Sequence, residues 1–581
     1  MLRGMGESVL ETVDDPVETG DRDGAASTDR SPRWVALAVF LGFLVVTIGL
    51  YALPILTRFG SACVGRCVPD TSIYAWSMRW MPYAIGAGAD PLYSEIVWAP
   101  VGTNLAWVTS VPGPALVMSP VTQLFGPVVS VNVLMLLAPT LAAWAAFLLL
   151  REVTGRIWPS IAGAAVFGYS TYIGQHMRSH LNLLLVFFVP LAAYLVVRRV
   201  RGRIGPLAFV ALLTLTLVGQ FSVSSELFAT MTLFGAIAMA GAVAFAGERR
   251  PAIVGTLPLI LLAYALTAIA VSPFLVKALR EAPTGSIRPL ELNSVDLLSF
   301  VLPRRPMLFG GERFAPVTAD FPGKPWDDTG YVGIALLVVA ASFAWTRRRE
   351  RSTWLVLGFA AVAAVLALGP VLHVDGEPIT TLMPGRVTAA LPLIQHALPE
   401  RFPVYLFLAL AVIAALWLAS APDRRSRSIR YGAVAVAVVL MLPHQVVQIR
   451  GRDLVVPAFF REGTFREHIE DGENVLAVPR KLGGDLVWQA EADMAFRLAR
   501  TYLGPVRPTG LPALPPILSS GSELPTRGAL GTFLEARDVG VVVVEEPADE
   551  RVVTWLEDVL GVTGVGVDGV LVYQVPSELP D

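Results

Sequence analysis

Two cysteines and a carboxylate share one short stretch of the chain, "SACVGRCVPD". Cys63 and Cys67 are the only cysteines among the 581 residues, and Asp70 follows them by three positions. The C-x₃-C spacing differs from the C-x-x-C of redox catalysts, and no further cysteine or histidine lies close in sequence to complete a zinc site. If this loop faces an oxidising compartment, we expect a local disulfide that fixes its geometry. Two free thiols and a metal site are the alternatives.

Asp70 is the first candidate for a catalytic group. It precedes the segment 71–85, "TSIYAWSMRWMPYAI", whose aromatic residues at 74, 76, 80 and 83 are spaced for a helix lying at a membrane surface. A carboxylate held there can act as a general base on a hydroxyl presented at that surface. The alternative is structural, because Asp70 or Thr71 would serve well as the N-cap of the helix. Three other acids are secondary candidates: Asp90, Glu95 and Glu226.

Basic residues at the ends of apolar runs could hold a phosphate at the same level. Lys277 and Arg280 follow one such run and, three residues apart, share one face of a helix. Arg401 stands at the start of a later run, in "PERFP". Basic residues at this level would suit a lipid-linked phosphate. Ordinary snorkelling of their side chains towards lipid headgroups is the alternative.

The segment 174–183, "GQHMRSHLNL", gathers polar side chains between two apolar runs, namely His176, Arg178, His180 and Asn182. Such a turn could bind sugar hydroxyls or phosphate, and the alternative is a solvated turn without a ligand. A divalent metal at this surface is possible, but the histidines alone do not define a metal site. The metal ligands therefore stay unknown.

These residues must be positioned by helices that cross a membrane. The chain is 54% hydrophobic and 16% charged, whereas soluble domains average about 25% charged residues. Apolar runs of about 18 residues or more indicate spans. We predict an α-helical polytopic membrane protein with about eleven spans, at 33–56, 128–150, 157–174, 181–197, 204–219, 225–246, 252–275, 330–345, 353–369, 402–420 and 430–448. A further apolar stretch, 111–125, is broken by three prolines and is expected to be a surface or re-entrant piece, with a true span as the alternative.

The distribution of arginine predicts the orientation. The positive-inside rule assigns arginine-rich short loops to the cytoplasm. Five alternate loops hold 16 arginines in 35 residues, whereas the loops between them hold 13 basic residues in about 168. This pattern places the N-terminus in the cytoplasm and three long loops outside: 57–127, 276–329 and 370–401. It predicts a multi-pass protein of the inner or plasma membrane.

The two ends of the chain differ from the transmembrane region, 33–448. Residues 1–32 are acidic and poor in aromatic residues, which indicates a disordered cytoplasmic tail. Residues 449–581 are typical of a small α/β domain, expected outside the cytoplasm. In it, "NVLAVPRK" and "VGVVVVEE" indicate buried strands, and "WQAEADMAFRLARTYLG" and "DERVVTWLEDVLG" indicate amphipathic helices. "VGVDGVLVYQVP" predicts a hairpin that turns at Asp568-Gly569.

Nucleotide-dependent functions lack their motifs in this sequence. There is no P-loop, no dinucleotide-binding fingerprint after a strand and no G-x-S-x-G. We therefore expect no direct use of nucleotides, no nucleic-acid partner and no cofactor that can be named with certainty. The spans are also nearly free of charge at mid-depth, and the polar residues gather at one surface. That pattern favours chemistry at the surface over transport through the bundle.

Several features together resemble the GT-C superfamily of membrane glycosyltransferases, which use polyprenyl-phosphate sugars. These are the long first outer loop with an early acid, about eleven spans and an outer C-terminal domain. Four stretches also resemble a group of bacterial membrane proteins usually placed near these transferases: "DPLYSEIVWAPVGTNLAW" (90–107), "LGPVLHVDG" (368–376), "LPERFPVYLFLAL" (398–410) and "LVWQAEADMAFRLARTYLG" (486–504). The resemblance covers residues 33–575.

The resemblance implies that Asp70 is the catalytic base of an inverting glycosyltransferase. The donor would be a polyprenyl-phosphate sugar, and the acceptor a glycan, lipid or protein of the cell envelope. Some GT-C members carry paired acids at this position, but Thr71 and Ser72 follow Asp70 here. The C-terminal domain would hold the acceptor or a partner, with Trp488 and Tyr502 stacking on sugars or packing in its core. The alternatives are a transporter or flippase for a lipid-linked glycan and a non-catalytic envelope assembly protein.

Overall fold

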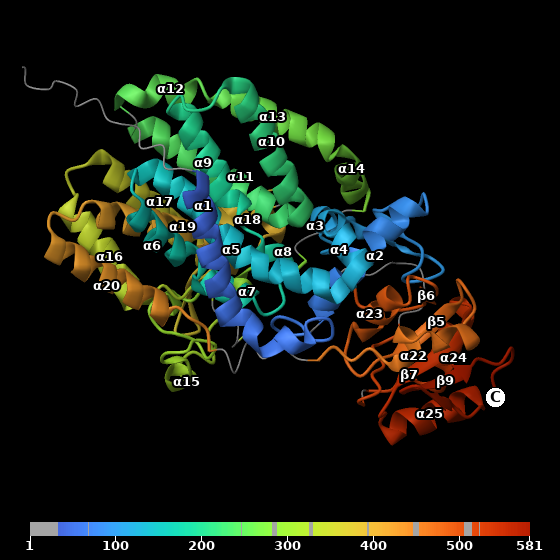
Figure 1. The fold of residues 1–581 in the computed structure, drawn as a ribbon. Helices are drawn as coiled ribbons and strands as arrows, with labels where there is room; N and C mark the ends of the chain where they lie inside the picture. Colours follow the sequence, from blue (N-terminus) through green and yellow to red (C-terminus); the bar gives the residue numbers. More distant parts are fainter. Residues whose placement is uncertain are drawn as a thin grey trace, which may run out of the picture.

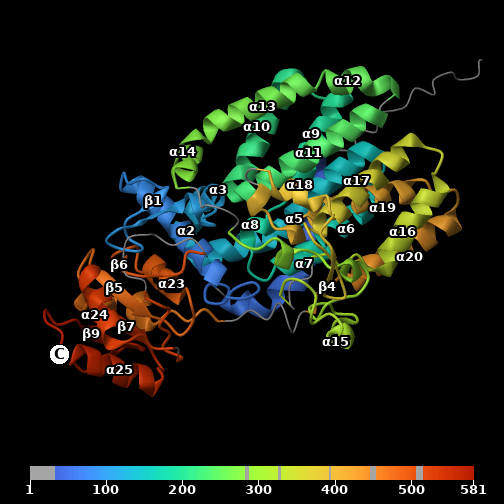
Figure 2. The same ribbon diagram turned by 180° about the vertical axis from the view of Figure 1, so that it is seen from behind.

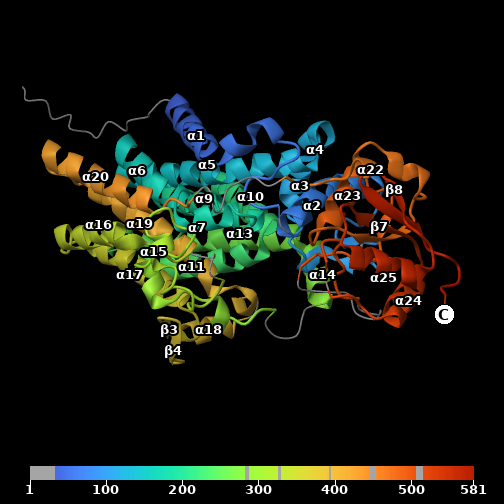
Figure 3. The ribbon, with the colours of Figure 1, turned by 90° about the horizontal axis from the view of Figure 1, so that it is seen from below.

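A computed structural model describes residues 33–67, 69–245, 247–281, 287–324, 329–391, 394–444, 453–504, 514–521 and 523–580. The tail expected at 1–32 lies outside these ranges. Within them, the chain forms a helical bundle followed by a small α/β domain (Figure 1). Figures 1 and 3 place this C-terminal domain at one end of the bundle, beside α2 and α3 and away from α16 and α20.

Seven helical segments of the described residues are long and apolar enough to cross a membrane. They are Trp34–Arg58 (α1, Arg33–Thr47, with two short turns), α5 (Pro127–Thr154), Leu181–Val200 (α8, Leu181–Leu184, and α9, Phe188–Val200), α10 (Pro206–Val223), α11 (Ser225–Phe245), Gly247–Ala270 (containing α12, Arg250–Val254, and α13, Leu257–Ala270) and Pro399–Ala419 (containing α19, Pro403–Ala419). The chain is therefore a multi-pass membrane protein.

Four more of the expected spans fall on shorter helices. These are α6 (Ile157–Gly168), α16 (Gly333–Thr346), α17 (Arg351–Ala367) and α20 (Arg424–Leu440). The total of about eleven spans stays a prediction. The stretch 111–125 forms two short helices, α3 (Pro112–Val117) and α4 (Ser119–Phe125), and neither is long enough to cross a bilayer.

The loops of the bundle separate into two sets along α5. Near the end of this helix, Glu152 forms ion pairs with Arg201 and Arg203, which belong to another arginine-rich loop. Arg156 also donates a hydrogen bond to the carbonyl of Ala419, at the loop that precedes α20. Three of the arginine-rich loops thus meet at one end of α5, and the first long loop lies at the other. Which end faces the cytoplasm stays a prediction of the positive-inside rule.

The first long loop is built around helix α2 (Pro69–Gly86). Proline at the first helical position suits its fixed φ, and Asp70 lies in the first turn, where the helix dipole favours a negative charge. The helix expected at 71–85 is present, but Tyr74, Trp76 and Trp80 are buried in protein instead of facing a lipid surface. Trp76 and Trp80 stack with ring centroids 5.3 Å apart. The reason is that α2 packs between the C-terminal domain and the helices α3 and α5 of the bundle.

Short elements complete the loops at this end of the bundle. They are the pair β1 (Tyr93–Ser94) and β2 (Thr103–Asn104), α7 (Thr171–His176), α14 (Ser272–Arg280), α15 (Gly311–Phe314), the antiparallel hairpin of β3 (Leu372–Val374) and β4 (Glu377–Thr380), and α18 (Gly385–Ala389).

The C-terminal domain is a five-stranded sheet with strand order β6-β5-β7-β9-β8. Its strands are β5 (Asn474–Val478), β6 (Arg497–Leu498), β7 (Val539–Glu545), β8 (Val565–Val567) and β9 (Val570–Gln574), and its helices are α22 (Ala458–Arg461), α23 (Gly484–Glu491), α24 (Arg527–Ala536) and α25 (Glu550–Leu560). Strands β5, β6 and β7 are parallel, and β9 is antiparallel to both neighbours. The expected hairpin turns at Asp568-Gly569, both with positive φ, as a tight turn between twisted strands requires.

The single helix predicted over 488–504 is wrong. Helix α23 ends at Glu491, and Asp493 and Met494 both have positive φ, which an α-helix cannot contain. The chain then enters β6, where Leu498 forms a bridge with Val97 of the first long loop. The conformation of this segment is thus determined by its contact with the first long loop.

The C-terminal domain lies beside α2 (Figure 2), and hydrogen bonds of buried side chains join it to the first long loop. Trp76 of α2 donates to the side-chain oxygen of Gln489 at 2.6 Å. The Gln489 amide nitrogen in turn donates to the carbonyls of Ile96 (2.8 Å) and Phe496 (2.7 Å). Arg537, which is buried, donates to the carbonyls of residues 98 and 99. The domain and α2 are therefore one packed unit.

Candidate functional site

Asp70 lies beside a histidine from a distant part of the chain. Its carboxylate Oδ2 is 3.4 Å from Nε2 of His180, and its side chain is 32% exposed. Because α2 begins at Pro69, neither Asp70 nor Thr71 is its N-cap. Thr71 instead donates to the carbonyl of Arg66 at 2.9 Å. The carboxylate is thus partly open to the surface and held by His180.

Opposing influences act on the ionisation of Asp70. Burial raises the pKa of the carboxyl, but the hydrogen bond and charge of His180 and the charges of Arg288 and Lys324 lower it, and the net pKa is below its usual range. The carboxylate is therefore ionised at neutral pH and can accept a proton. Sequence reasoning missed Arg288 and Lys324 as site residues, although Lys324 is one of only three lysines in the chain.

The segment 174–183 is buried and is not a solvated turn, contrary to that alternative. His176, Arg178 and Asn182 are each less than 9% exposed. Asn182 accepts a hydrogen bond from the hydroxyl of Tyr74 at 2.6 Å, which joins the segment to α2. The residues that follow α7 are thus packed against the helix that carries Asp70.

His176 lies behind His180 as seen from Asp70. Nδ1 of His176 is 3.3 Å from Nδ1 of His180. The rings of Tyr172 and His176 pack edge to face, with their centroids 4.4 Å apart. Burial lowers the pKa of His176 well below its usual range, and the charges of His180 and Arg401 lower it further. His176 is therefore neutral.

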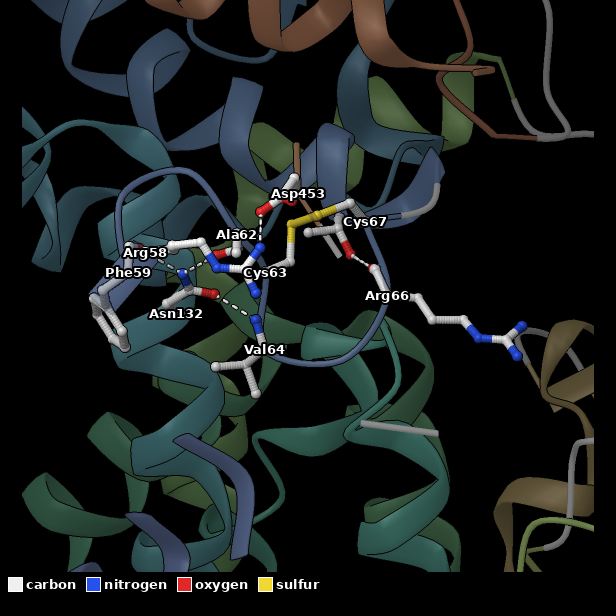
Figure 4. The surroundings of a disulfide bond; sticks show 10 residues. Arg58, Phe59, Ala62, Cys63, Val64, Arg66, Cys67, Asn132 and Asp453 are labelled. Carbon is white, nitrogen blue, oxygen red and sulfur yellow. Dashed lines mark hydrogen bonds and ion pairs between the residues drawn. A yellow bond between two sulfur atoms is a disulfide. The ribbon is translucent and has the colours of Figure 1, made fainter. Parts of the chain in front are cut away.

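The cysteines form the disulfide that the sequence analysis expected, with Cα atoms 5.5 Å apart. Asn132 of α5 braces this loop: it accepts from the backbone nitrogen of Val64 at 2.8 Å and donates to the carbonyls of Phe59 and Ala62 (Figure 4). Arg58 pairs with Asp453 at the base of the C-terminal domain.

The disulfide loop also touches the histidine segment. The backbone nitrogen of Arg66 donates to the carbonyl of Arg178 at 2.6 Å. Gly65 has a φ of +84°, and a Cβ there would lie 2.4 Å from the carbonyl oxygens of Met177 and Arg178. Only glycine fits this approach. The loop therefore joins α5, the histidine segment and the start of α2.

Two of the expected phosphate-binding cations form ion pairs elsewhere at the same end of the bundle. Lys277 pairs with Asp90 and lies 5.8 Å from the ring centroid of Tyr93. Arg401 pairs with Glu226, which also accepts from the backbone nitrogen of residue 398 at 3.1 Å. These pairs tie the secondary acid candidates Asp90 and Glu226 to cations. The remaining candidates, Glu95 and Arg280, are exposed.

The C-terminal domain places one of its two candidate aromatic residues near Asp70. The pKa of Tyr502 is raised by burial and by the charge of Asp70, while the charge of Arg288 lowers it. Trp488 is fully buried and stacks on Phe460 with ring centroids 5.1 Å apart, so it packs in the core. The site thus lies between the bundle and the C-terminal domain.

In the part of the chain that the structure describes, no group of three or more histidine, cysteine or carboxylate side chains could hold a metal ion. The side chains around Asp70 include several cations, which would repel a divalent metal. The described side chains around Asp70 therefore do not fit such an ion, and a divalent metal elsewhere at this surface stays a prediction.

A family of proteins defined by a shared domain of unknown function, DUF6311, matches residues 41–450. No curated protein matches the sequence. Among solved structures, the chain is similar to the arabinofuranosyltransferase AftD from Mycobacteria, with a TM-score of 0.52 and 14% identity over 94% of this chain and 40% of that chain. The chain thus spans well under half of that protein.

Two further solved structures are similar at lower TM-scores. The oligosaccharyltransferase of Archaeoglobus fulgidus gives 0.48, with 11% identity over 89% of this chain and 70% of that chain. ArnT from Cupriavidus metallidurans, bound to undecaprenyl phosphate, gives 0.45, with 11% identity over 93% and 98%. AftD, whose TM-score is above 0.5, is a GT-C glycosyltransferase, so the resemblance to GT-C is confirmed for the fold. The chain belongs to the DUF6311 family and has a GT-C-like fold.

Proposed function

We propose that the protein is a membrane glycosyltransferase that moves a sugar from a polyprenyl-phosphate donor to a cell-envelope acceptor on the outer face. The observation that carries this proposal is the placement of Asp70. An ionised carboxylate stands among cationic and imidazole side chains at the start of α2, between a GT-C-like bundle and the C-terminal domain. A lipid-linked donor reaches such a site from the membrane, and the acceptor reaches it from the aqueous side.

The reaction needs a base and a place for negative charge. The acceptor hydroxyl attacks the anomeric carbon, and the bond from that carbon to the phosphate oxygen breaks with its electron pair. Asp70 takes the hydroxyl proton. Polyprenyl phosphate leaves as a weak base, so no strong general acid is needed. Attack opposite the phosphate inverts the anomeric centre.

Cations near Asp70 would stabilise the departing phosphate. Arg288 and Lys324 are the first candidates, because their charges act on the Asp70 carboxyl. Lys277, Arg280 and Arg401 remain proposals for the same role. Lys277 and Arg401 would have to exchange a carboxylate partner for the donor phosphate.

The acceptor would bind on the side of the C-terminal domain. Tyr502 comes from this domain and interacts electrostatically with Asp70, which favours it as a stacking surface for a sugar. His176, Arg178, His180 and Asn182 are proposed to shape the other side of the site.

A donor panel tests the function directly. Purified full-length protein in lipid nanodiscs is incubated with radiolabelled polyprenyl-phosphate sugars and cell-envelope extracts, and released polyprenyl phosphate is separated by chromatography. We expect release with at least one donor, together with a labelled acceptor. Movement of intact donor between leaflets without release would instead identify a flippase. If no donor gives either release or movement, the result would favour an assembly protein.

A further inference from the structure

Three side chains form a continuous chain that ends at Asp70. Its carboxylate Oδ2 lies 3.4 Å from Nε2 of His180, and Nδ1 of His180 lies 3.3 Å from Nδ1 of His176. Both ring nitrogens of His180 therefore face a polar partner. The proton transfer proposed above uses only Asp70, so this histidine pair has no role in it yet.

His176 is fixed more firmly than an ordinary surface histidine. It is 5% exposed, its ring packs against Tyr172, and the hydroxyl of Tyr172 donates to the carbonyl of Leu183 at 3.0 Å. The backbone nitrogen of His180 also donates to the carbonyl of His176 at 3.0 Å. Nε2 of His176 has no hydrogen-bond partner among the described residues. Within the described ranges, the one polar contact of its ring is thus with His180.

The two imidazoles constrain one another chemically. A neutral imidazole has one donor nitrogen and one acceptor nitrogen. A hydrogen bond between the two Nδ1 atoms therefore needs one proton shared between them. When His176 supplies that proton, Nδ1 of His180 is the acceptor, and Nε2 of His180 carries the hydrogen that it donates to Asp70.

We propose that His180, braced by His176, is a positioning residue that fixes the Asp70 carboxylate for proton transfer and extends the transfer activity to lower pH. The inference deepens the proposed function and rests on it. The arrangement follows a general design, in which a third group orients the second and the second orients the reacting one.

The pH effect follows from the groups that face Asp70. These are His180 from the segment after α7, Arg288 and Lys324 from the loop 287–324, Tyr74 from α2 and Tyr502 from the C-terminal domain. After burial, which raises the pKa of Asp70, the hydrogen bond from His180 is the strongest influence and lowers it. Without His180, the charges of Arg288 and Lys324 alone, among the described residues, oppose the effect of burial. The pKa of Asp70 then rises, and the base is lost at a higher pH.

The role of His176 can be tested separately from that of His180. Tyr172 packs on its ring, and Arg401 acts on it through charge. A phenylalanine at 176 keeps most of the ring volume but removes the nitrogen that meets His180. His176→Phe therefore tests the brace while Asp70 and His180 are still present.

The experiment measures polyprenyl phosphate release as a function of pH by full-length protein in nanodiscs, for wild type, His180→Ala, His180→Gln and His176→Phe. We expect His180→Ala to lower kcat on the order of tenfold to a hundredfold, because a misplaced base reacts poorly, with KM for the donor unchanged. The acidic limb of kcat/KM should move to higher pH. His180→Gln should recover most of kcat through its amide donor, and His176→Phe should fall between wild type and His180→Ala.

His468→Gln in the C-terminal domain is the matched control and should keep the wild-type profile. A loss in His180→Ala that is equal at every pH, or no loss at all, would overturn the inference while the proposed function stands. An inactive wild type with every donor would overturn the proposed function itself. If His180→Ala does not fold, as judged by its thermal unfolding, His176→Phe decides: a wild-type kcat and a wild-type acidic limb in that variant overturn the inference.

Discussion

At the scale of residues, the disulfide loop leads directly into Asp70. It is held by Asn132 on one side and by the backbone of the histidine segment on the other. The disulfide closes a very short loop, so it should contribute only about 2 kcal/mol to the stability of the whole fold. Its main effect is expected on the local position of Asp70.

The first prediction concerns this loop. Cys63→Ser, alone and with Cys67→Ser, should lower transferase activity severalfold, as a milder version of Asp70→Asn, while the thermal unfolding temperature changes little. Activity and unfolding of purified protein are measured side by side. Undiminished activity in both variants would remove the role of the disulfide in positioning Asp70.

A second prediction at this scale concerns Asp485, in the first turn of α23. Burial raises the pKa of this carboxyl to about 6, despite the nearby charge of Arg500. The folded pKa lies above the ordinary value of 3.8, so the contribution to stability is greatest below that value and is lost as pH rises through about 6. Ionisation of Asp485 therefore lowers the free energy of unfolding at neutral pH by up to about 3 kcal/mol relative to low pH.

Hydrogen exchange of the full-length protein measures this effect. Peptides over α23 should be better protected at pH 5 than at pH 8, after correction for intrinsic exchange rates. Asp485→Asn should show nearly equal protection at both values. A wild-type protein whose protection is independent of pH would contradict the prediction.

At the scale of elements, α2 and α23 are joined by the side chain of Gln489. Its amide is fully buried, and it makes three hydrogen bonds, to Trp76, Ile96 and Phe496. Removing a buried partner leaves the opposite groups without hydrogen bonds, which costs about 1–3 kcal/mol for each group. These three hydrogen bonds, which we call the Gln489 clamp, therefore hold α2, the helix that carries Asp70, against the C-terminal domain.

The third prediction is that Gln489→Ala lowers the free energy of unfolding by about 2–4 kcal/mol, once the neighbouring groups have adjusted to the smaller side chain. Thermal unfolding in detergent and limited proteolysis of the C-terminal domain measure the loss. Gln574→Ala is the control, because this side chain makes one exposed hydrogen bond, and it should change stability by less than about 0.5 kcal/mol. Equal stability of the two variants would show that the clamp is unimportant.

The elements also show which sequence patterns are reliable. Each predicted span falls on a helix, because a long apolar run must satisfy its backbone groups internally. The strands β5 and β7 and the turn at Asp568-Gly569 follow from local patterns. The break after α23 does not, because Leu498 pairs with Val97 far away in the sequence.

The site was predictable only in part for the same reason. The resemblance to GT-C, together with the early position of Asp70 in the first long loop, is what led to its choice as the candidate base. Its contacts with His180, Arg288 and Lys324 depend on the fold, since these residues lie in other loops. The burial of the aromatic residues on α2 also depends on the C-terminal domain, which no local pattern in 71–85 reveals.

At the scale of the whole molecule, the two sets of loops lie at opposite ends of α5. The fourth prediction is that the end with the C-terminal domain lies outside the cytoplasm. In a Cys63→Ser/Cys67→Ser background, Asp471→Cys should react with a membrane-impermeant maleimide in intact cells. Arg249→Cys, in an arginine-rich loop, should react only after permeabilisation. The reverse labelling would contradict the assigned orientation.

The proposed transfer reaction depends on Asp70 as its base. Its most direct test is release of polyprenyl phosphate from a donor on which the wild type turns over, measured for Asp70→Asn beside Asp90→Asn, Glu95→Gln and Glu226→Gln. We predict that Asp70→Asn loses activity by about 100-fold or more, since an amide cannot accept the proton, while it folds and binds the donor. Full turnover by folded Asp70→Asn, with loss of activity in one of the other three variants, would contradict the account.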